Sequence, residues 1–298
     1  MTLTTKHMFR PIFITLSIAI LLATIGIVSG ITIEGTPFSE AEGGIFSGLL
    51  NALFYTLFAI IGITIVYIAI KYGKEKILRI ILMMCFGFMG VFLIFFYSFL
   101  FLTIFGSYDL IYLILISIFS LFFGLYLTYI LFSEKSSLSK KNTVLLLYGA
   151  LIGAFLGIVL PTWTAFLFVG ILSIYDIIAV FRGPIKKIIE MTEEDEDTNL
   201  PVDMTYATRN WEIGLGDLAF YSMLSTHTLL LGFQIDFLLD FGLIGAIIPC
   251  FATTLGIILG AFFTFQLLKK REMLPGLPIS IGLGILFYLI SLLIFWIL

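Results

Sequence analysis

The sequence contains few charged residues for its length. Of its 298 residues, 12% are charged and 60% are hydrophobic. A soluble domain usually carries about a quarter charged residues, because its surface must face water. Only a protein that is surrounded by lipid over most of its surface tolerates so little charge. The composition therefore excludes a soluble protein and leaves no length for a separate soluble domain.

Cysteine and histidine are also scarce. Cys85 and Cys250 both lie in apolar runs, which excludes a disulfide framework and a cysteine-based metal site. His7 and His227 are too few and too far apart in the sequence for a zinc motif. We therefore expect no metal and no cofactor.

Long apolar runs account for most of the chain. A bilayer core about 30 Å thick needs roughly 20 apolar residues per helix. Polar and turn-forming breaks divide the sequence into runs of about this length. The predicted spans are 11–31, 46–70, 78–104, 109–132, 143–160, 162–181, 213–233, 241–267 and 278–298. The sequence thus predicts an all-α polytopic membrane protein with nine transmembrane helices.

The basic residues orient these spans. All 16 lie before the first span, or in or at the edge of alternate connections: Lys6, Arg10, Lys71, Lys74, Lys76, Arg79, Lys135, Lys140, Lys141, Arg182, Lys186, Lys187, Arg209, Lys269, Lys270 and Arg271. The opposite connections contain six acids and no Lys or Arg: Glu34, Glu40, Glu42, Asp109, Asp236 and Asp240. Basic connections stay in the cytoplasm. We expect a cytoplasmic N-terminus, an extracytoplasmic C-terminus and a hydrophilic cytoplasmic loop over 183–210.

Two aspartates lie inside predicted spans. An ionisable group there costs several kcal/mol, which favours a functional reason for its presence. Asp176 lies in span six and Asp217 in span seven, each about six residues, or roughly 9 Å, from the cytoplasmic boundary. Because the two spans are consecutive and antiparallel, both carboxyl groups can face each other at one depth. Such a pair shares one proton and is suited to activating water.

Unusual backbone sequences accompany the aspartates. Gly214 and Gly216 precede Asp217 and would let a substrate backbone approach it closely, although Gly-x-Gly can equally be a flexible junction. Pro275-Gly276-Leu277-Pro278, which we call the strap, enters span nine on the same side of the membrane. Its two prolines restrict the backbone and delay the helix to Pro278. An ordinary proline at a helix start explains Pro278 but not Pro275-Gly276.

Three motifs together resemble the presenilin and signal peptide peptidase family of intramembrane aspartyl proteases. They are Tyr175-Asp176 in span six, Gly214-Leu215-Gly216-Asp217 in span seven, and Pro275-Gly276-Leu277-Pro278 before span nine. The family has Ala where this chain has Gly276. Prepilin peptidases also carry Gly-x-Gly-Asp, but the other two motifs and the predicted orientation resemble presenilins.

The resemblance implies roles for these residues. Asp176 and Asp217 would be catalytic, Tyr175 would pack beside them, and Gly214, Leu215 and Gly216 would line the cleft. The strap residues Pro275, Gly276, Leu277 and Pro278 would hold the substrate.

The implied function is endoproteolysis within the transmembrane helices of other proteins, without a cofactor. We expect single-span proteins or peptides as substrates, the lipid bilayer as surroundings, and no nucleic acid. The sequence does not tell whether the protein needs obligate protein partners or forms a homo-oligomer. The location is the cell membrane of a prokaryote or an endomembrane of a eukaryote. The alternative is an ion- or proton-coupled transporter or channel that uses the same aspartates. The sequence has no second Gly-x-Gly-Asp, which counts against an inverted-repeat transporter.

Overall fold

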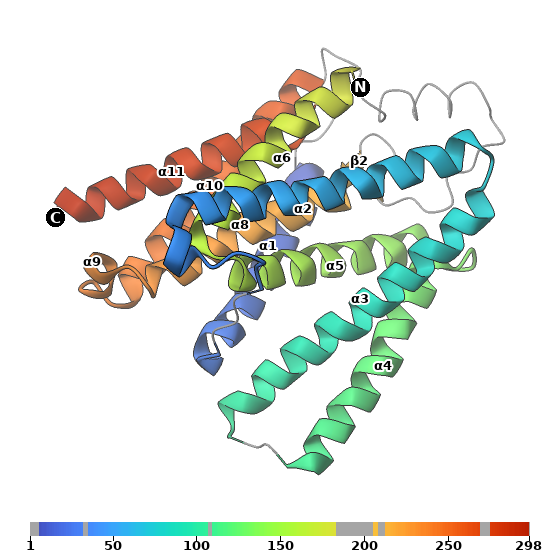
Figure 1. Cartoon of the computed structure of the whole chain (residues 1–298), viewed down its shortest axis with the longest axis horizontal. Coiled ribbons are helices and arrows are strands. Elements are labelled where there is room, and N and C mark those ends of the chain that lie inside the picture. Colours follow the sequence, from blue (N-terminus) through green and yellow to red (C-terminus); the bar gives the residue numbers. More distant parts are fainter. Residues whose placement is uncertain are drawn as a thin grey trace.

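The computed structural model describes residues 6–31, 35–106, 109–182, 205–207, 212–268 and 275–297. Within these ranges the chain is almost entirely helical (Figure 1). The helices are α1 (Lys6–Ser29), α2 (Glu40–Lys71), α3 (Glu75–Ile104), α4 (Leu110–Phe132), α5 (Leu138–Val159), α6 (Thr162–Arg182), α8 (Leu215–Gly232), α9 (Asp236–Leu239), α10 (Leu243–Leu268) and α11 (Leu277–Ile297). The strands are β1 (Thr205–Ala207) and β2 (Glu212–Gly214). Each of the nine predicted spans corresponds to a helix, which confirms the all-helical fold.

Eight of the described helices are long and apolar enough to cross a membrane, and α8 is the predicted span that is not among them. Its 18 residues include an aspartate, a histidine and several hydroxyl side chains, which lower its hydropathy. Most of α8 is buried against other helices, so its polar groups face protein and not lipid. The chain is an integral, multi-pass membrane protein, and the ninth crossing stays a prediction that depends on α8.

Several helix boundaries differ from the predicted ones by one to six residues, and two of the differences have a clear local cause. Helix α2 begins at Glu40, six residues before the predicted start, and contains a bend at Gly44, whose φ of 53° suits only glycine. Helix α8 begins at Leu215 because the preceding residues pair as β2, so the predicted start at 213 was wrong.

The strap is also slightly shorter than predicted. Helix α11 begins at Leu277, one residue earlier than expected, because a proline is tolerated in the first turn of a helix. Pro275 and Gly276 are not helical, as their sequence predicted. The predicted loop 183–210 is described only over 205–207, which form β1.

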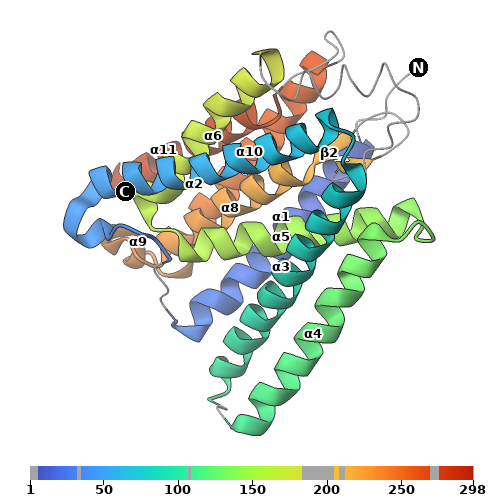
Figure 2. The ribbon, with the colours of Figure 1, turned by 45° about the vertical axis from the view of Figure 1, so that its right-hand side comes forward.

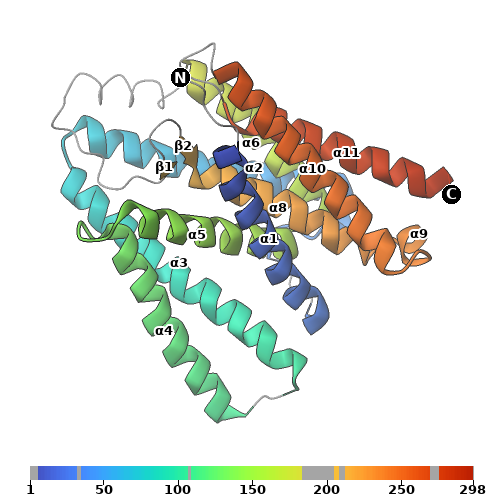
Figure 3. The ribbon, with the colours of Figure 1, turned by 180° about the vertical axis from the view of Figure 1, so that it is seen from behind.

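Glycines bring α5 very close to α8. A Cβ atom added at Gly153 would collide with the Cβ of Ser222 and the carbonyl of Ala219, and one at Gly157 would collide with the Thr226 hydroxyl. Small residues at four-residue spacing allow such close contact between membrane helices. Figure 3 shows α1 crossing in front of this pair, with α10 and α11 beside it. Helix α8 is therefore fixed on several sides.

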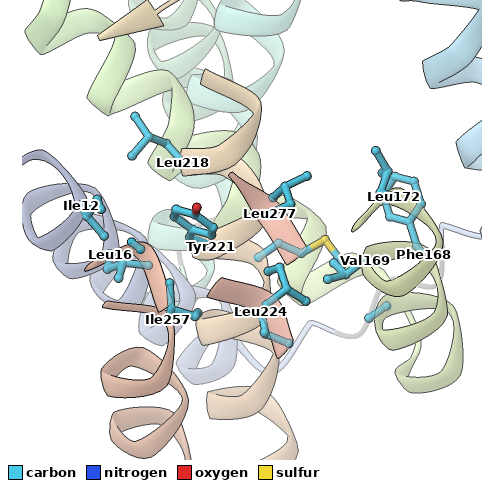
Figure 4. Packing of buried hydrophobic residues seen from close by; sticks show 14 of the residues in the cluster. Ile12, Leu16, Phe168, Val169, Leu172, Leu218, Tyr221, Leu224, Ile257 and Leu277 are labelled. Carbon is cyan, nitrogen blue, oxygen red and sulfur yellow. The ribbon is translucent and has the colours of Figure 1, made fainter. Parts of the chain in front are cut away.

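A buried apolar cluster lies where α1, α6, α8, α10 and α11 meet (Figure 4). It includes Ile12, Leu16, Val169, Leu172, Leu218, Tyr221, Leu224, Ile257 and Leu277. Because Leu277 belongs to the strap and Leu218 follows Asp217, this cluster supports the candidate site directly.

Hydrogen bonds near the ends of the helices join chain connections that the Lys and Arg pattern assigns to the same side of the membrane. At one end of the bundle, Arg79 of α3 donates to the Phe132 carbonyl at 2.8 Å, and Asn142 of α5 bonds Ala207 of β1. At the other end, Glu40 of α2 bonds the start of α6. The strands and α9 lie at opposite ends in Figures 1 and 3, and the α3–α4 hairpin diverges from the rest in Figure 2. This grouping agrees with the predicted alternation of sides.

Candidate active site

Asp176 lies in the last two turns of α6 and contacts the strap. The backbone amide of Leu277 donates to its Oδ2 atom at 3.2 Å. The side chain is half-buried, so the carboxylate is held by protein on one side. Because this amide is in the first turn of α11, it has no partner within its own helix and is free to bind the carboxylate.

Asp217 lies in the first turn of α8 and contacts the strap at Gly276, the residue before Leu277. A Cβ atom at Gly276 would collide with the Asp217 carboxylate, so the two groups are in direct contact. Because Asp176 contacts Leu277 and Asp217 contacts Gly276, the two carboxyl groups converge on consecutive residues of the strap. The structure thus brings together both aspartates and the strap, as their sequence positions predicted.

The strap is held by two hydroxyl groups that the sequence did not single out. The Tyr221 hydroxyl donates to the Gly276 carbonyl at 2.9 Å, and the Ser280 hydroxyl donates to the same oxygen at 3.2 Å. Tyr221 follows Asp217 by one helical turn, so both side chains lie on one face of α8. That spacing is a signal, but tyrosine is too common in this chain for it to have decided the role.

The remaining predicted site residues divide into two groups. Gly214 ends β2 and precedes α8 with extended backbone, and Gly216 has open space around it among the described residues. Tyr175 is half-buried next to Asp176 on α6. Leu215, in contrast, is buried in an apolar cluster with residues of α3, α4 and α5. The structure therefore assigns Leu215 to packing, and its predicted role in lining the cleft gains no support.

The strap itself is only partly open. Pro275 and Leu277 are buried, whereas Gly276 and Pro278 are half-buried. Gly276 leaves no room for the methyl group that the family's Ala would add unless the Asp217 carboxylate rotates. In this chain the glycine therefore leaves the space that the Asp217 carboxylate occupies.

A cavity of about 110 Å³ borders Asp217. It is lined by Ile12, Glu212, Ile213, Asp217, Tyr221, Ala261, Thr264, Phe265, Leu268 and Gly276. This volume accommodates several water molecules, and the carboxylates of Asp217 and Glu212 provide acceptors for them. Among the described residues, His, Cys, Asp and Glu nowhere gather in a group of three that could hold a metal ion. The arrangement can position water beside a carboxyl pair.

The presenilin family model matches residues 4–213, which is more than half of the chain. The chain belongs to the presenilin family. The matched region includes Tyr175-Asp176 and ends one residue before Gly214. The assignment of Asp217 and the strap therefore rests on their motifs and on the geometry described above.

Individual presenilin-family proteins show the same relationship. The chain is similar to Presenilin-B of Dictyostelium discoideum, with 37% identity over 140 residues. This match covers 44% of the chain but only 26% of Presenilin-B, so the chain matches about a quarter of that relative.

Two crystal forms of a presenilin family intramembrane aspartate protease have a similar structure, with TM-scores of 0.63 and 0.64. They cover 96% and 98% of this chain and 97% and 99% of the solved chains, at 16% identity. That similarity confirms the presenilin fold over nearly the whole chain.

Proposed function

We propose that this presenilin-family protein is an intramembrane aspartyl endopeptidase, with Asp176 and Asp217 as its catalytic pair. The observation that carries the proposal is the convergence of both carboxylates on consecutive strap residues, Gly276 and Leu277. Family membership supports it. The two acids lie among buried residues, which explains how they persist in spans six and seven, where the sequence provides no Lys or Arg.

The chemistry follows from a carboxyl pair that shares one proton. The charged member takes a proton from a water molecule while the neutral member donates a hydrogen bond to the scissile carbonyl oxygen. The water oxygen then bonds the carbonyl carbon and forms a tetrahedral hydrate. Collapse of the hydrate breaks the C–N bond, the leaving nitrogen takes a proton from the pair, and a new carboxyl end remains. No covalent bond to the enzyme is needed.

The substrate class is a transmembrane helix that is locally unwound. Peptide bonds inside a helix are shielded by their own hydrogen bonds, so the scissile segment must become extended before water can attack it. An extended segment can add a strand to an exposed sheet edge. The strand β2 runs directly into α8 and ends three residues before Asp217, which places such an edge beside the site.

The pairing of β1 with β2 identifies the available edge. Asn142 bonds both the carbonyl and the amide of Ala207, at 2.8 and 3.2 Å, so these groups face away from β2. In the antiparallel register Ala207 lies opposite Glu212. The backbone groups of Glu212 therefore face away from β1, towards the outer edge of β2. We assign this outer edge, next to the cavity at Asp217, to the extended substrate.

The test uses the purified full chain in detergent micelles with a reporter protein that has a single transmembrane helix. Products are identified by mass, and we expect cleavage within the apolar segment of the reporter. Asp176→Asn and Asp217→Asn should each reduce the rate by several orders of magnitude, and a hydroxyethylene transition-state analogue should inhibit the native protein. Asp236→Asn, at a carboxyl group outside the site, is the matched control and should retain activity.

Two results contradict the proposal. One is cleavage that persists in both aspartate variants, which would assign the activity to other groups. The other is an aspartate-dependent ion flux through vesicles that hold the protein, without any cleavage of the reporter. That second result would instead favour the transporter alternative.

A further inference from the structure

The N-terminus of α6 is capped by a residue of another helix. Glu40, the first residue of α2, accepts the backbone amide of Trp163 on Oε2 at 3.0 Å. Its Oε1 accepts both the amide and the hydroxyl of Thr164, each at 2.5 Å. First-turn amides have no partner within their own helix and are usually capped by the residue that precedes it. Here that residue is Pro161, whose side chain cannot accept a hydrogen bond.

Asn51 reinforces the same connection from inside α2. It is fully buried, and its amide group donates to the Thr164 hydroxyl at 3.1 Å. It also bonds the carbonyl and the amide of Phe38, at 2.8 and 3.0 Å, which fixes the segment that leads into Glu40. A carboxylate, a carboxamide and a hydroxyl thus join α2 to the first turn of α6.

Helix α6 is attached mainly to α2. The two helices pack extensively, with Gly48 of α2 directly against Trp163 and the ring of Tyr55 5.8 Å from that of Phe168. Contacts between α6 and α8 are fewer, although these helices carry the two aspartates. The position of Asp176 along the bundle axis is therefore determined chiefly by α2 and not by the helix of Asp217.

We propose that Glu40 is a positioning residue for proteolysis, which locks α6 to α2 and so sets the depth of Asp176 against the strap. Asp176 is 12 residues beyond Thr164 on the same helix, about 18 Å along its axis. A helix transmits an axial displacement over this length almost unchanged. Release of the Glu40 contact would shift Asp176 relative to Leu277 and Asp217. This inference rests on the proposed catalytic role of Asp176.

The first variant is Glu40→Gln, which keeps the size of the side chain and removes its charge. Because hydrogen bonds to a charged group are stronger than neutral ones, we expect kcat to fall on the order of tenfold. KM should stay within about twofold, since Glu40 lies far from the proposed substrate edge. Glu42→Gln is the matched control: Glu42 is exposed in the same turn and makes no described bond to α6, so kcat should not change.

A second variant separates positioning from simple stabilisation of the helix. Glu40→Gln combined with Pro161→Asp provides α6 with its own capping carboxylate but does not restore the link to α2. We expect Glu40→Gln alone to lower the thermal midpoint. The double variant should regain that midpoint, whereas its kcat should stay low. Recovery of kcat together with stability would overturn the proposal, because capping alone would then be sufficient.

A substitute variant and a comparison with Asp176→Asn test the role of Glu40 separately from the proposed function. Should Glu40→Gln fail to fold, Thr164→Val removes one bond to Glu40 and the bond from Asn51, and an unchanged kcat would contradict the inference. If Asp176→Asn is inactive while Glu40→Gln has native kcat, only this inference fails. If Asp176→Asn still cleaves the reporter, the proposed function itself is wrong.

Discussion

At the scale of single residues, Tyr221 connects the strap to the helix of Asp217. Its buried hydroxyl bonds the Gly276 carbonyl, so Tyr221→Phe would remove one of two donors to that oxygen. A hydrogen bond of this kind contributes about 1 kcal/mol. We expect kcat to fall about fivefold in Tyr221→Phe because Gly276 would no longer hold the Asp217 carboxylate as firmly, with catalysis measured on the single-span reporter.

Tyr97→Phe is the matched control for this change. The Tyr97 hydroxyl is also buried and donates to a backbone carbonyl, that of Leu151 at 3.3 Å, but it lies between α3 and α5. Removal of the Tyr97 hydroxyl should lower the thermal midpoint by about as much as removal of the Tyr221 hydroxyl, but kcat should stay near the native value. Equal losses of kcat in both variants would show that Tyr221 acts only through overall stability.

The two aspartates were predictable from the sequence, whereas the residues that position them were not. An acid in an apolar run is conspicuous because its burial is expensive, and the spans alone gave Asp176 and Asp217 a common depth. Tyr221 has no such signal. Glu40 was assigned to an ordinary extracytoplasmic connection, because contacts between distant segments are visible only after folding.

At the scale of secondary structure, the contact between α5 and α8 determines where Asp217 is held. We expect Gly153→Ala to force these helices apart, since its new methyl group would meet backbone atoms of α8. Overpacking of this kind costs about 1–3 kcal/mol. The expected result is a thermal midpoint lower by several degrees and reduced cleavage, measured on purified protein.

Gly62→Ala is suited as the comparison. Gly62 lies within α2 and has open space around it among the described residues, and alanine favours a helix over glycine by about 1 kcal/mol. This variant should match or exceed the native thermal midpoint. If Gly153→Ala also kept the native thermal midpoint, α5 and α8 would not pack as closely as the structure describes.

The helices were predictable as elements, and the strands were not. Runs of about 20 apolar residues gave every long helix to within a few residues at most ends, because lipid permits few alternatives to a helix. The strands β1 and β2 have three residues each, too short for a recognisable alternation of polar and apolar side chains. Strand β1 lies in the predicted hydrophilic loop 183–210, and β2 overlaps the predicted start of span seven.

At the scale of the whole molecule, the number of crossings depends on α8. The C-terminal end of α8 lies at the end of the bundle opposite the strands. There, a cavity of about 420 Å³ is lined jointly by the last turns of α1, α5 and α8. Because α8 begins beside β2 and ends at this cavity, it extends from one end of the bundle to the other. A polar helix can do so when neighbouring helices separate it from lipid.

Cysteine labelling of intact cells tests this crossing and the orientation together. In a Cys85→Ser and Cys250→Ser background, Ser137→Cys would report the α4–α5 connection and Gln234→Cys the residues after α8. The basic residues place the first in the cytoplasm and the second outside. We expect a membrane-impermeant maleimide to label only Gln234→Cys until the membrane is opened. The reverse pattern would invert the chain, whereas labelling of both from one side would mean that α8 does not cross.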